Sequence, residues 1–126
     1  MPRVTVTQRN ATILVVDDDA DIRDALGMVL RDEGYHVVPA LDGQAALDIL
    51  NAGVKPAAIL LDLMMPRMNG LEFLERSREL LGFARIPVIV VSANQGYDAS
   101  DLGVAQVVRK PFTAEVVIEA LGRAAA

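Results

Sequence analysis

Three aspartates, one serine and one lysine follow apolar, strand-like runs in this chain. Asp17 and Asp18 follow the run Ile-Leu-Val-Val, Asp62 follows Ala-Ala-Ile-Leu-Leu, Ser92 follows Pro-Val-Ile-Val-Val, and Lys110 follows Ala-Gln-Val-Val-Arg. In an open parallel sheet the carboxyl ends of the strands lie along one edge, and ligands bind there. The spacing therefore predicts that acids, a hydroxyl group and an amine meet at one edge of a sheet.

These residue types suit magnesium-dependent phosphoryl chemistry. The adjacent carboxylates of Asp17 and Asp18 repel each other, and a divalent cation removes that cost. Mg2+ prefers oxygen ligands and keeps several waters, so two or three acids and a backbone carbonyl suffice. Asp62 can bind the metal and also attack phosphorus, because carboxylates form acyl phosphates. The ammonium group of Lys110 suits a phosphate or a carboxylate, and the hydroxyl group of Ser92 can hydrogen-bond a phosphoryl oxygen.

An aspartate at a strand end can instead simply cap the next helix. We adopt that explanation for Asp19, whose side chain can accept from the first N–H groups of a helix. Capping does not account for three acids at the ends of two central strands. Lys110 is one of only two lysines in the chain, and a cis bond to Pro111 would aim it inward.

Strand and helix signals alternate from residue 13 to the end of the chain. We expect strands at residues 13–17, 35–39, 57–62, 87–92 and 105–109. Longer helices are expected after Asp19, from Asp42-Gly43 to about Asn51, from Asn69 to about Leu81-Gly82, and after Thr113, with a brief or frayed one within residues 94–102. This alternation predicts a doubly wound α/β fold. Residues 1–11 are interpreted as a loose lead-in, and residues 12–126 as one domain.

Composition limits the class of protein. The chain has 126 residues, of which 52% are hydrophobic, and a net charge of −5. That charge disfavours direct nucleic acid binding, which requires a basic face. Cysteine is absent, which excludes disulfides and thiolate metal sites, and no apolar run approaches the ~18 residues of a membrane span. We expect a cytoplasmic domain that contacts neither nucleic acid nor membrane.

Four segments resemble the receiver domain of two-component response regulators, in particular the single-domain, chemotaxis-regulator type. They are residues 13–18 (Ile-Leu-Val-Val-Asp-Asp), 61–70 (Leu-Asp-Leu-Met-Met-Pro-Arg-Met-Asn-Gly), 88–93 (Val-Ile-Val-Val-Ser-Ala) and 109–112 (Arg-Lys-Pro-Phe). They occur in the family's order, and the resemblance covers residues 12–124. It implies a flavodoxin-like fold with a five-stranded parallel sheet, strand order 2-1-3-4-5, and five flanking helices.

The resemblance also implies a role for each matching residue. Asp62 would be the phosphoacceptor, supplied by a phosphohistidine of a sensor histidine kinase or a phosphotransfer protein. Mg2+ would be bound directly by Asp18, Asp62 and the backbone carbonyl of Met64, and through water by Asp17. Lys110 would contact the acyl phosphate, Ser92 would rotate inward to hydrogen-bond it, Met64, Ala93 and Asn94 would neighbour it, and Pro66 and Gly70 would shape the loop after Asp62. Such a protein catalyses only its own phosphorylation and dephosphorylation, and acts on a downstream protein as a monomer or weak dimer.

Two departures from the family pattern affect the expected switch. Val107 occupies a position, three residues before the lysine, where the family often has an aromatic ring. The segment from Ser92 to Gly103 is about one helical turn short, so we expect a shortened fourth helix. A receiver that binds partners without phosphorylation is therefore an alternative. A phosphatase of the haloacid dehalogenase type is a weaker one, because the second acid of that family corresponds to Met64.

Some further residues are given structural interpretations. His36, the single histidine, lies on an expected strand rather than on the exposed helix face that phosphotransfer requires. Arg76, Arg78 and Arg85 are interpreted as solvated surface charges. The sequence starts with Met and no domain follows the last expected helix, so we expect a stand-alone regulator or the N-terminal part of a larger protein.

Overall fold

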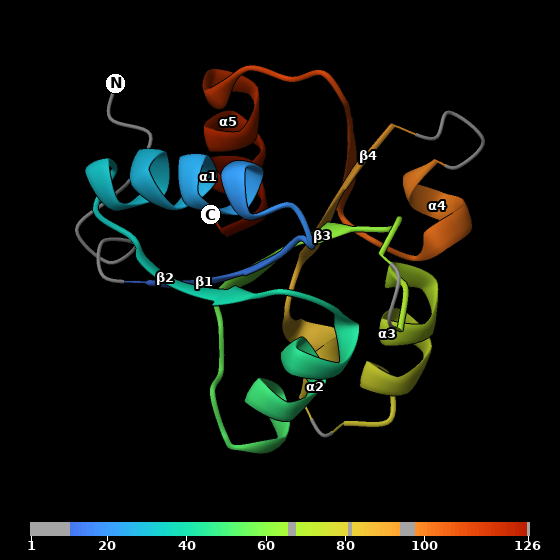
Figure 1. The fold of residues 1–126 in the computed structure, drawn as a ribbon. Helices are drawn as coiled ribbons and strands as arrows, with labels where there is room; N and C mark the ends of the chain where they lie inside the picture. The colour runs from blue at the N-terminus through green and yellow to red at the C-terminus, as the bar shows by residue number, and fades with distance from the viewer. Residues whose placement is uncertain (1–10, 66–67, 81, 94–97, 126) are drawn as a thin grey trace.

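The computed structural model contains a five-stranded parallel sheet with helices on both faces (Figure 1). It describes residues 11–65, 68–80, 82–93 and 98–125. The strands are β1 (Thr12–Val16), β2 (His36–Ala40), β3 (Ala58–Asp62), β4 (Val88–Ser92) and β5 (Gln106–Arg109). The helices are α1 (Ala20–Asp32), α2 (Gly43–Asn51), α3 (Gly70–Ser77), α4 (Ala99–Leu102) and α5 (Ala114–Ala125), with a 3-10 helix η1 (Phe83–Arg85). The strand order β2-β1-β3-β4-β5 confirms the predicted doubly wound, flavodoxin-like fold.

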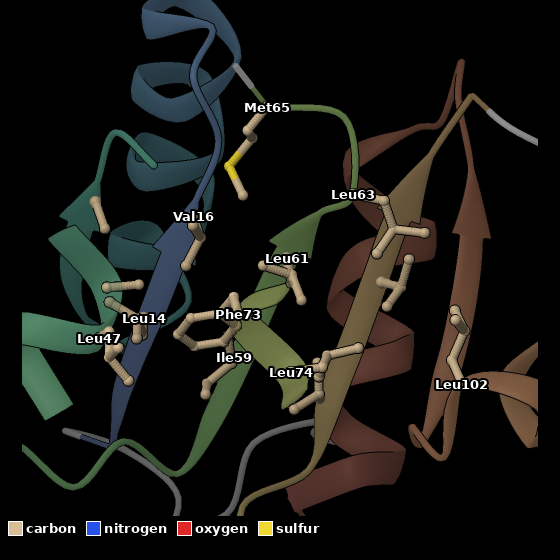
Figure 2. Close-up of a cluster of buried hydrophobic side chains, with 14 of the residues drawn as sticks. Leu14, Val16, Leu47, Ile59, Leu61, Leu63, Met65, Phe73, Leu74 and Leu102 are labelled. Atoms are coloured by element: carbon tan, nitrogen blue, oxygen red, sulfur yellow. The ribbon is translucent and has the colours of Figure 1, made fainter. Parts of the chain in front are cut away.

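The sheet separates two hydrophobic clusters. Successive strand residues point to opposite faces, so Leu14 and Val16 of β1 enter one cluster while Ile13 and Val15 enter the other. Helices α2 and α3 cover the first face, and α1 and α5 cover the second (Figure 1). In the first cluster the ring of Phe73 lies among the side chains of the central strands (Figure 2). Strands β1, β3 and β4 are buried on both faces, as their continuous apolar sequences predict.

Side-chain caps begin the helices where the sequence predicts. Asp19 accepts from the N–H groups of Asp21 and Ile22, Asp42 from Ala45, Asn69 from Glu72, and Thr113 from Val116. Each bond satisfies a backbone donor that has no partner within its own helix. The predicted starts of α1, α2, α3 and α5 are thereby confirmed, and these starts position the loops at the carboxyl edge of the sheet.

The prediction for the end of α3 was wrong. The helix ends at Ser77 rather than near residues 81–82, and the chain continues into η1. Phe83 folds back onto Phe73, with ring centroids 6.2 Å apart and planes at 80°. Gly82 makes the necessary turn with a φ of 83°. The burial of Phe83 therefore ends α3 earlier than its apolar periodicity suggests.

Strand bounds differ from the predictions by one residue at several ends. For β2 the prediction was 35–39, and the strand is His36–Ala40. Tyr35 lies before the strand because its N–H donates to Leu30 O at the end of α1, at 3.1 Å, and its side chain is buried. Ala40 instead pairs with Val16 and completes the strand.

Helix α4 has four residues, which confirms the expected shortening. Its first turn is capped by Asp98, which accepts from the N–H of Asp101 at 2.8 Å. At its other end Arg78 donates to the carbonyl oxygen of Leu102. Arg78, although exposed, is therefore more than the solvated charge that the sequence suggested, because it links α3 to α4.

Within the described residues, every helix is too short or too polar to span a bilayer.

The start of α2 requires a glycine. A Cβ atom at Gly43 would clash with the carbonyl oxygen and the side chain of Met68, in the loop between β3 and α3. We predict that Gly43→Ala lowers the free energy of unfolding by about 1–3 kcal/mol, the usual cost of overpacking, as measured by urea denaturation.

Gly27→Ala is the matched control for this substitution. Gly27 lies inside α1, and a Cβ atom there would first meet the flexible end of Arg31 at 3.0 Å. Alanine should stabilise that helix by about 1 kcal/mol or less. Equal stability of the Gly43→Ala variant and the wild-type protein would contradict the close approach of α2 to Met68.

Candidate functional site

Three carboxylates converge where β1 and β3 end. Asp17, Asp18 and Asp62 each offer a carboxylate oxygen, and these oxygens lie within 4.8 Å of one another. The parallel pairing of β1 with β3, in register at Val16 and Leu61, brings the strand ends together. Asp17 and Asp62 are buried, whereas Asp18 is exposed, so the group opens to solvent on one side. Carboxylate oxygens in this arrangement are the ligands that Mg2+ prefers.

Lys110 reaches this group from β5, across the end of β4. Its Nζ lies 3.5 Å from Oδ2 of Asp17 and 3.5 Å from Oδ2 of Asp62. The backbone N–H of Lys110 donates to Ser92 O at 3.0 Å, which fixes the start of the side chain beside β4. The bond between Lys110 and Pro111 is cis. One ammonium group is thus shared between two buried carboxylates.

Asp62 has an unusual electrostatic environment. Burial raises the pKa of Asp62 above its ordinary value, and repulsion from Asp17 and Asp18 raises it further. The N–H of Met64, which donates to Oδ1 of Asp62 at 3.0 Å, and the charge of Lys110 oppose this effect. Because the net pKa shift is upward, the ionised form of Asp62 is less stable here than in water.

Of the remaining residues implied by the resemblance, Ser92, Ala93, Met64 and Gly70 lie within the described part of the chain. Ser92 ends β4 and is buried, Ala93 after it is exposed, and the side chain of Met64 is exposed. Asn94 and Pro66 lie outside the described residues. A Cβ atom at Gly70 would lie 2.8 Å from the carbonyl oxygen of Asp62, so the loop can pass this close only with glycine.

Val107 packs on the first hydrophobic cluster. It is partly buried and pairs with Val90 in the parallel ladder of β4 and β5. An aliphatic side chain in this place has no ring to swing between the core and the surface.

Sequence reasoning missed Arg23. Its guanidinium donates through Nη1 to the carbonyl oxygen of Asp17 at 2.8 Å. Arg23 is the fourth residue of α1, near a helix N-terminus, where the helix dipole disfavours a cation. This unfavourable position in the helix could have drawn attention to Arg23. An arginine near the N-terminus of a helix suggests a hydrogen-bond acceptor outside the helix that offsets the unfavourable dipole.

Comparison with known proteins identifies a family. The model of the response regulator receiver domain matches residues 13–122. Response regulator MprA of Mycolicibacterium vanbaalenii is 37% identical over 110 residues, which are 84% of this chain and 46% of that protein. A protein-glutamate methylesterase/protein-glutamine glutaminase of Treponema pallidum is 41% identical over 111 residues, which are 82% of this chain and 27% of that protein. The chain thus spans less than half the length of these relatives.

Solved structures give the same result. The receiver domain of Francisella response regulator 1452 superposes with a TM-score of 0.83 at 27% identity, covering 92% of this chain and 97% of that one. The chemotaxis protein CheY4 of Vibrio cholerae also gives 0.83, at 29% identity, covering 90% and 98%. Both likenesses extend over nearly the whole chain.

The raised pKa of Asp62 predicts a pH-dependent effect on stability. The folded protein holds the Asp62 proton to higher pH than the unfolded chain, so stability falls as pH rises from the unfolded pKa of about 3.9 through the folded one. Asp62→Asn should therefore raise the melting temperature at pH 7 in the presence of a chelator. The gain in melting temperature should vanish below about pH 4, where the protonated Asp62 of the wild-type protein is as uncharged as the asparagine of the variant.

Asp24→Asn is the control for this measurement, because it removes the same charge from an exposed position on α1. Its melting temperature should stay near that of the wild-type protein at every pH. A lower melting temperature of Asp62→Asn at pH 7 would contradict the electrostatic cost assigned to Asp62.

Proposed function

Because this chain belongs to the response regulator receiver domain family, we propose that it is a phosphoacceptor of a two-component system, with Asp62 as the accepting residue. One observation carries the proposal. Asp62 is buried, and one of its carboxylate oxygens lies within 4.8 Å of a carboxylate oxygen of Asp17 and of Asp18. The ammonium group of Lys110 is 3.5 Å from the carboxylate of Asp62. A nucleophile, a hard-cation site and a phosphate-binding cation thus lie side by side.

The proposed reaction is a transfer from a phosphohistidine of a sensor histidine kinase or phosphotransfer protein. A carboxylate oxygen of Asp62 attacks phosphorus, the new P–O bond forms, and the P–N bond to the donor imidazole breaks. The imidazole nitrogen keeps the electron pair of that bond. The upward pKa shift fits a carboxylate whose charge is poorly solvated and therefore reactive.

Mg2+ fits this site by the chemistry of its donors. Asp18, Asp62 and the backbone carbonyl of Met64 would hold it directly, and when bound it would neutralise charge on the transferred phosphoryl group. Asp17 would act through water. In support, Oδ1 of Asp17 already accepts from the N–H of Asp19 at 2.9 Å, and Oδ2 already faces Lys110.

The other groups would hold the product. Lys110 would exchange its contact with the two carboxylates for one with the acyl phosphate, whose oxygens carry more charge. Ser92, at the end of β4, would hydrogen-bond a phosphoryl oxygen and move the segment after it. Because Val107 is aliphatic and already packed, this movement would change the backbone near α4 rather than the position of a ring.

The proposal includes protein partners only. The output would be altered contact with a downstream protein, by a monomer or a weak dimer, in the cytoplasm. The net charge of −5 disfavours direct contact with nucleic acid. Methylesterase or glutaminase activity belongs to the relative of that name, of which this chain matches 27%.

A phosphorylation-independent binding module is the second candidate, favoured by the packed Val107 and the four-residue α4. The phosphatase alternative has less support. The position of its second acid is held by Met64, whose exposed thioether cannot act as a general acid.

Intact-mass measurement tests the phosphoacceptor directly. After incubation with acetyl phosphate and Mg2+, the protein should gain one phosphoryl group, and a chelator should prevent the gain. Asp62→Asn should gain none. Asp19→Asn is the matched control in the same acidic region, and should react like the wild-type protein because asparagine also caps a helix. No gain in the folded wild-type protein, with its own kinase also supplied, would favour the binding module.

Replacing Lys110 should separate metal binding from phosphoryl transfer. Lys110→Met removes a cation that repels Mg2+, so the protein should bind Mg2+ more tightly. The same variant loses the charged bond to the phosphoryl group, and phosphorylation at saturating Mg2+ should slow about tenfold to a hundredfold. Lys55→Met, at an exposed position, is the control. An unchanged rate of phosphorylation in Lys110→Met would contradict the proposed contact between Lys110 and the phosphoryl group.

A further inference from the structure

We propose that Arg23 is a positioning residue that sets the affinity of the acidic group for a divalent cation. The inference rests on the proposed function, since it concerns the same site. It adds a residue of α1 whose side chain bonds a backbone carbonyl rather than a carboxylate in the described contacts. Its effect passes through one backbone carbonyl, that of Asp17, to which Nη1 of Arg23 donates at 2.8 Å.

Asp17 is held at every polar group that it has. Its N–H donates to Ala40 O at 3.1 Å, and its side-chain Oδ1 accepts from the N–H of Asp19 at 2.9 Å. Its Oδ2 lies 3.5 Å from Nζ of Lys110. The carbonyl oxygen, one residue beyond the end of β1, accepts from Arg23.

This carbonyl controls where Asp18 points. The carbonyl oxygen of Asp17 and the N–H of Asp18 share one rigid peptide plane. Fixing the direction of the oxygen therefore fixes ψ of Asp17 and restricts φ of Asp18, from whose Cα the carboxylate extends. Asp18 is exposed and so has little packing of its own to hold it. Without Arg23, we expect the peptide to turn and the three-acid arrangement to be populated for less of the time.

The backbone of Arg23 is itself held in place. Its own N–H donates to Asp19 O at 2.9 Å in the first turn of α1, and the side chain is partly buried. The helix and the turn that carries the acids are therefore joined at both Asp17 and Asp19. Outer partners of this kind commonly change metal affinity by about 10- to 100-fold when removed.

The sign of the effect distinguishes positioning from charge. Arg23 is a cation bound to the backbone carbonyl of Asp17, one of the three acids, so its charge alone opposes the binding of another cation. If charge were its only contribution, its removal would strengthen Mg2+ binding. If it positions the turn, its removal weakens binding in spite of the lost repulsion. The two roles thus predict opposite changes in one measured quantity.

The experiment is calorimetric titration of the full chain with Mg2+ alone, at constant ionic strength. Arg23→Met keeps much of the length of the side chain and removes its donors, and should weaken Mg2+ binding about tenfold. Arg23→Lys keeps a positively charged donor group and should recover part of that loss. Arg31→Met removes the same charge from the last turn of the same helix, at an exposed position, and should change little. Circular dichroism and melting temperature establish that each variant is folded.

Each outcome is decisive. Unchanged or tighter Mg2+ binding in Arg23→Met would overturn the inference, as would a wild-type chain that binds no Mg2+. Should methionine prevent folding, Arg23→Gln replaces it, with weaker binding again expected. In phosphorylation by acetyl phosphate, Arg23→Met should require more Mg2+ for half-maximal rate, while the rate at saturation stays near that of the wild-type protein.

Failure of the proposed function gives a different pattern. A wild-type chain that binds Mg2+ in an Arg23-dependent way but accepts no phosphoryl group would sink the phosphoacceptor and leave this inference standing. If the wild-type chain is phosphorylated but Arg23→Met leaves its Mg2+ affinity unchanged, the proposed function stands and this inference is wrong.

Discussion

Repulsion among carboxylates at one sheet edge is the constraint on which the rest of the structure depends. Asp17, Asp18 and Asp62 each place one carboxylate oxygen within 4.8 Å of the other two, and the side chains of Asp17 and Asp62 are buried. Lys110 contacts two of them, but one positive charge cannot balance three negative ones. The fold must therefore hold an arrangement that its own electrostatics opposes, which is typical of sites shaped for function rather than for stability.

The sheet supplies the rigidity that this requires. Strands β1, β3 and β4 are buried on both faces, so the strand ends that carry the acids cannot drift apart without opening the core. Close backbone contacts extend this rigidity to the loops. Gly70 allows the chain to pass against the carbonyl of Asp62, and Gly43 allows α2 to approach Met68. The loop that carries Met64 is thus packed against both β3 and α2. These contacts restrict the positions of the acids at the site.

Most of the fold, and the acidic group itself, could be predicted because both depend on short-range patterns. Apolar runs marked the strands, Asp19, Asn69 and Thr113 marked helix starts, and parallel topology then brought the acids together. What could not be predicted depends on tertiary contacts that no local sequence pattern marks. Helix α3 ends early because Phe83 packs on Phe73, and the partners of Arg23 and Arg78 are backbone carbonyls. A carbonyl oxygen is present at every residue, so no residue type in the sequence marks it as an acceptor.

The bond from Arg78 to Leu102 changes how one surface of the molecule must be understood. A helix of four residues is too short to persist by its own hydrogen bonds, so α4 is stabilised by the cap of Asp98, by the bond from Arg78 and by the burial of Leu102. One of these supports, Arg78, is the residue that follows α3, 24 positions before Leu102 in the chain. A protein that recognises the surface around α4 therefore also recognises, indirectly, a residue that it need not touch. A difference in recognition between related chains could then arise from the residue that follows α3, and a comparison confined to the residues of α4 would overlook it.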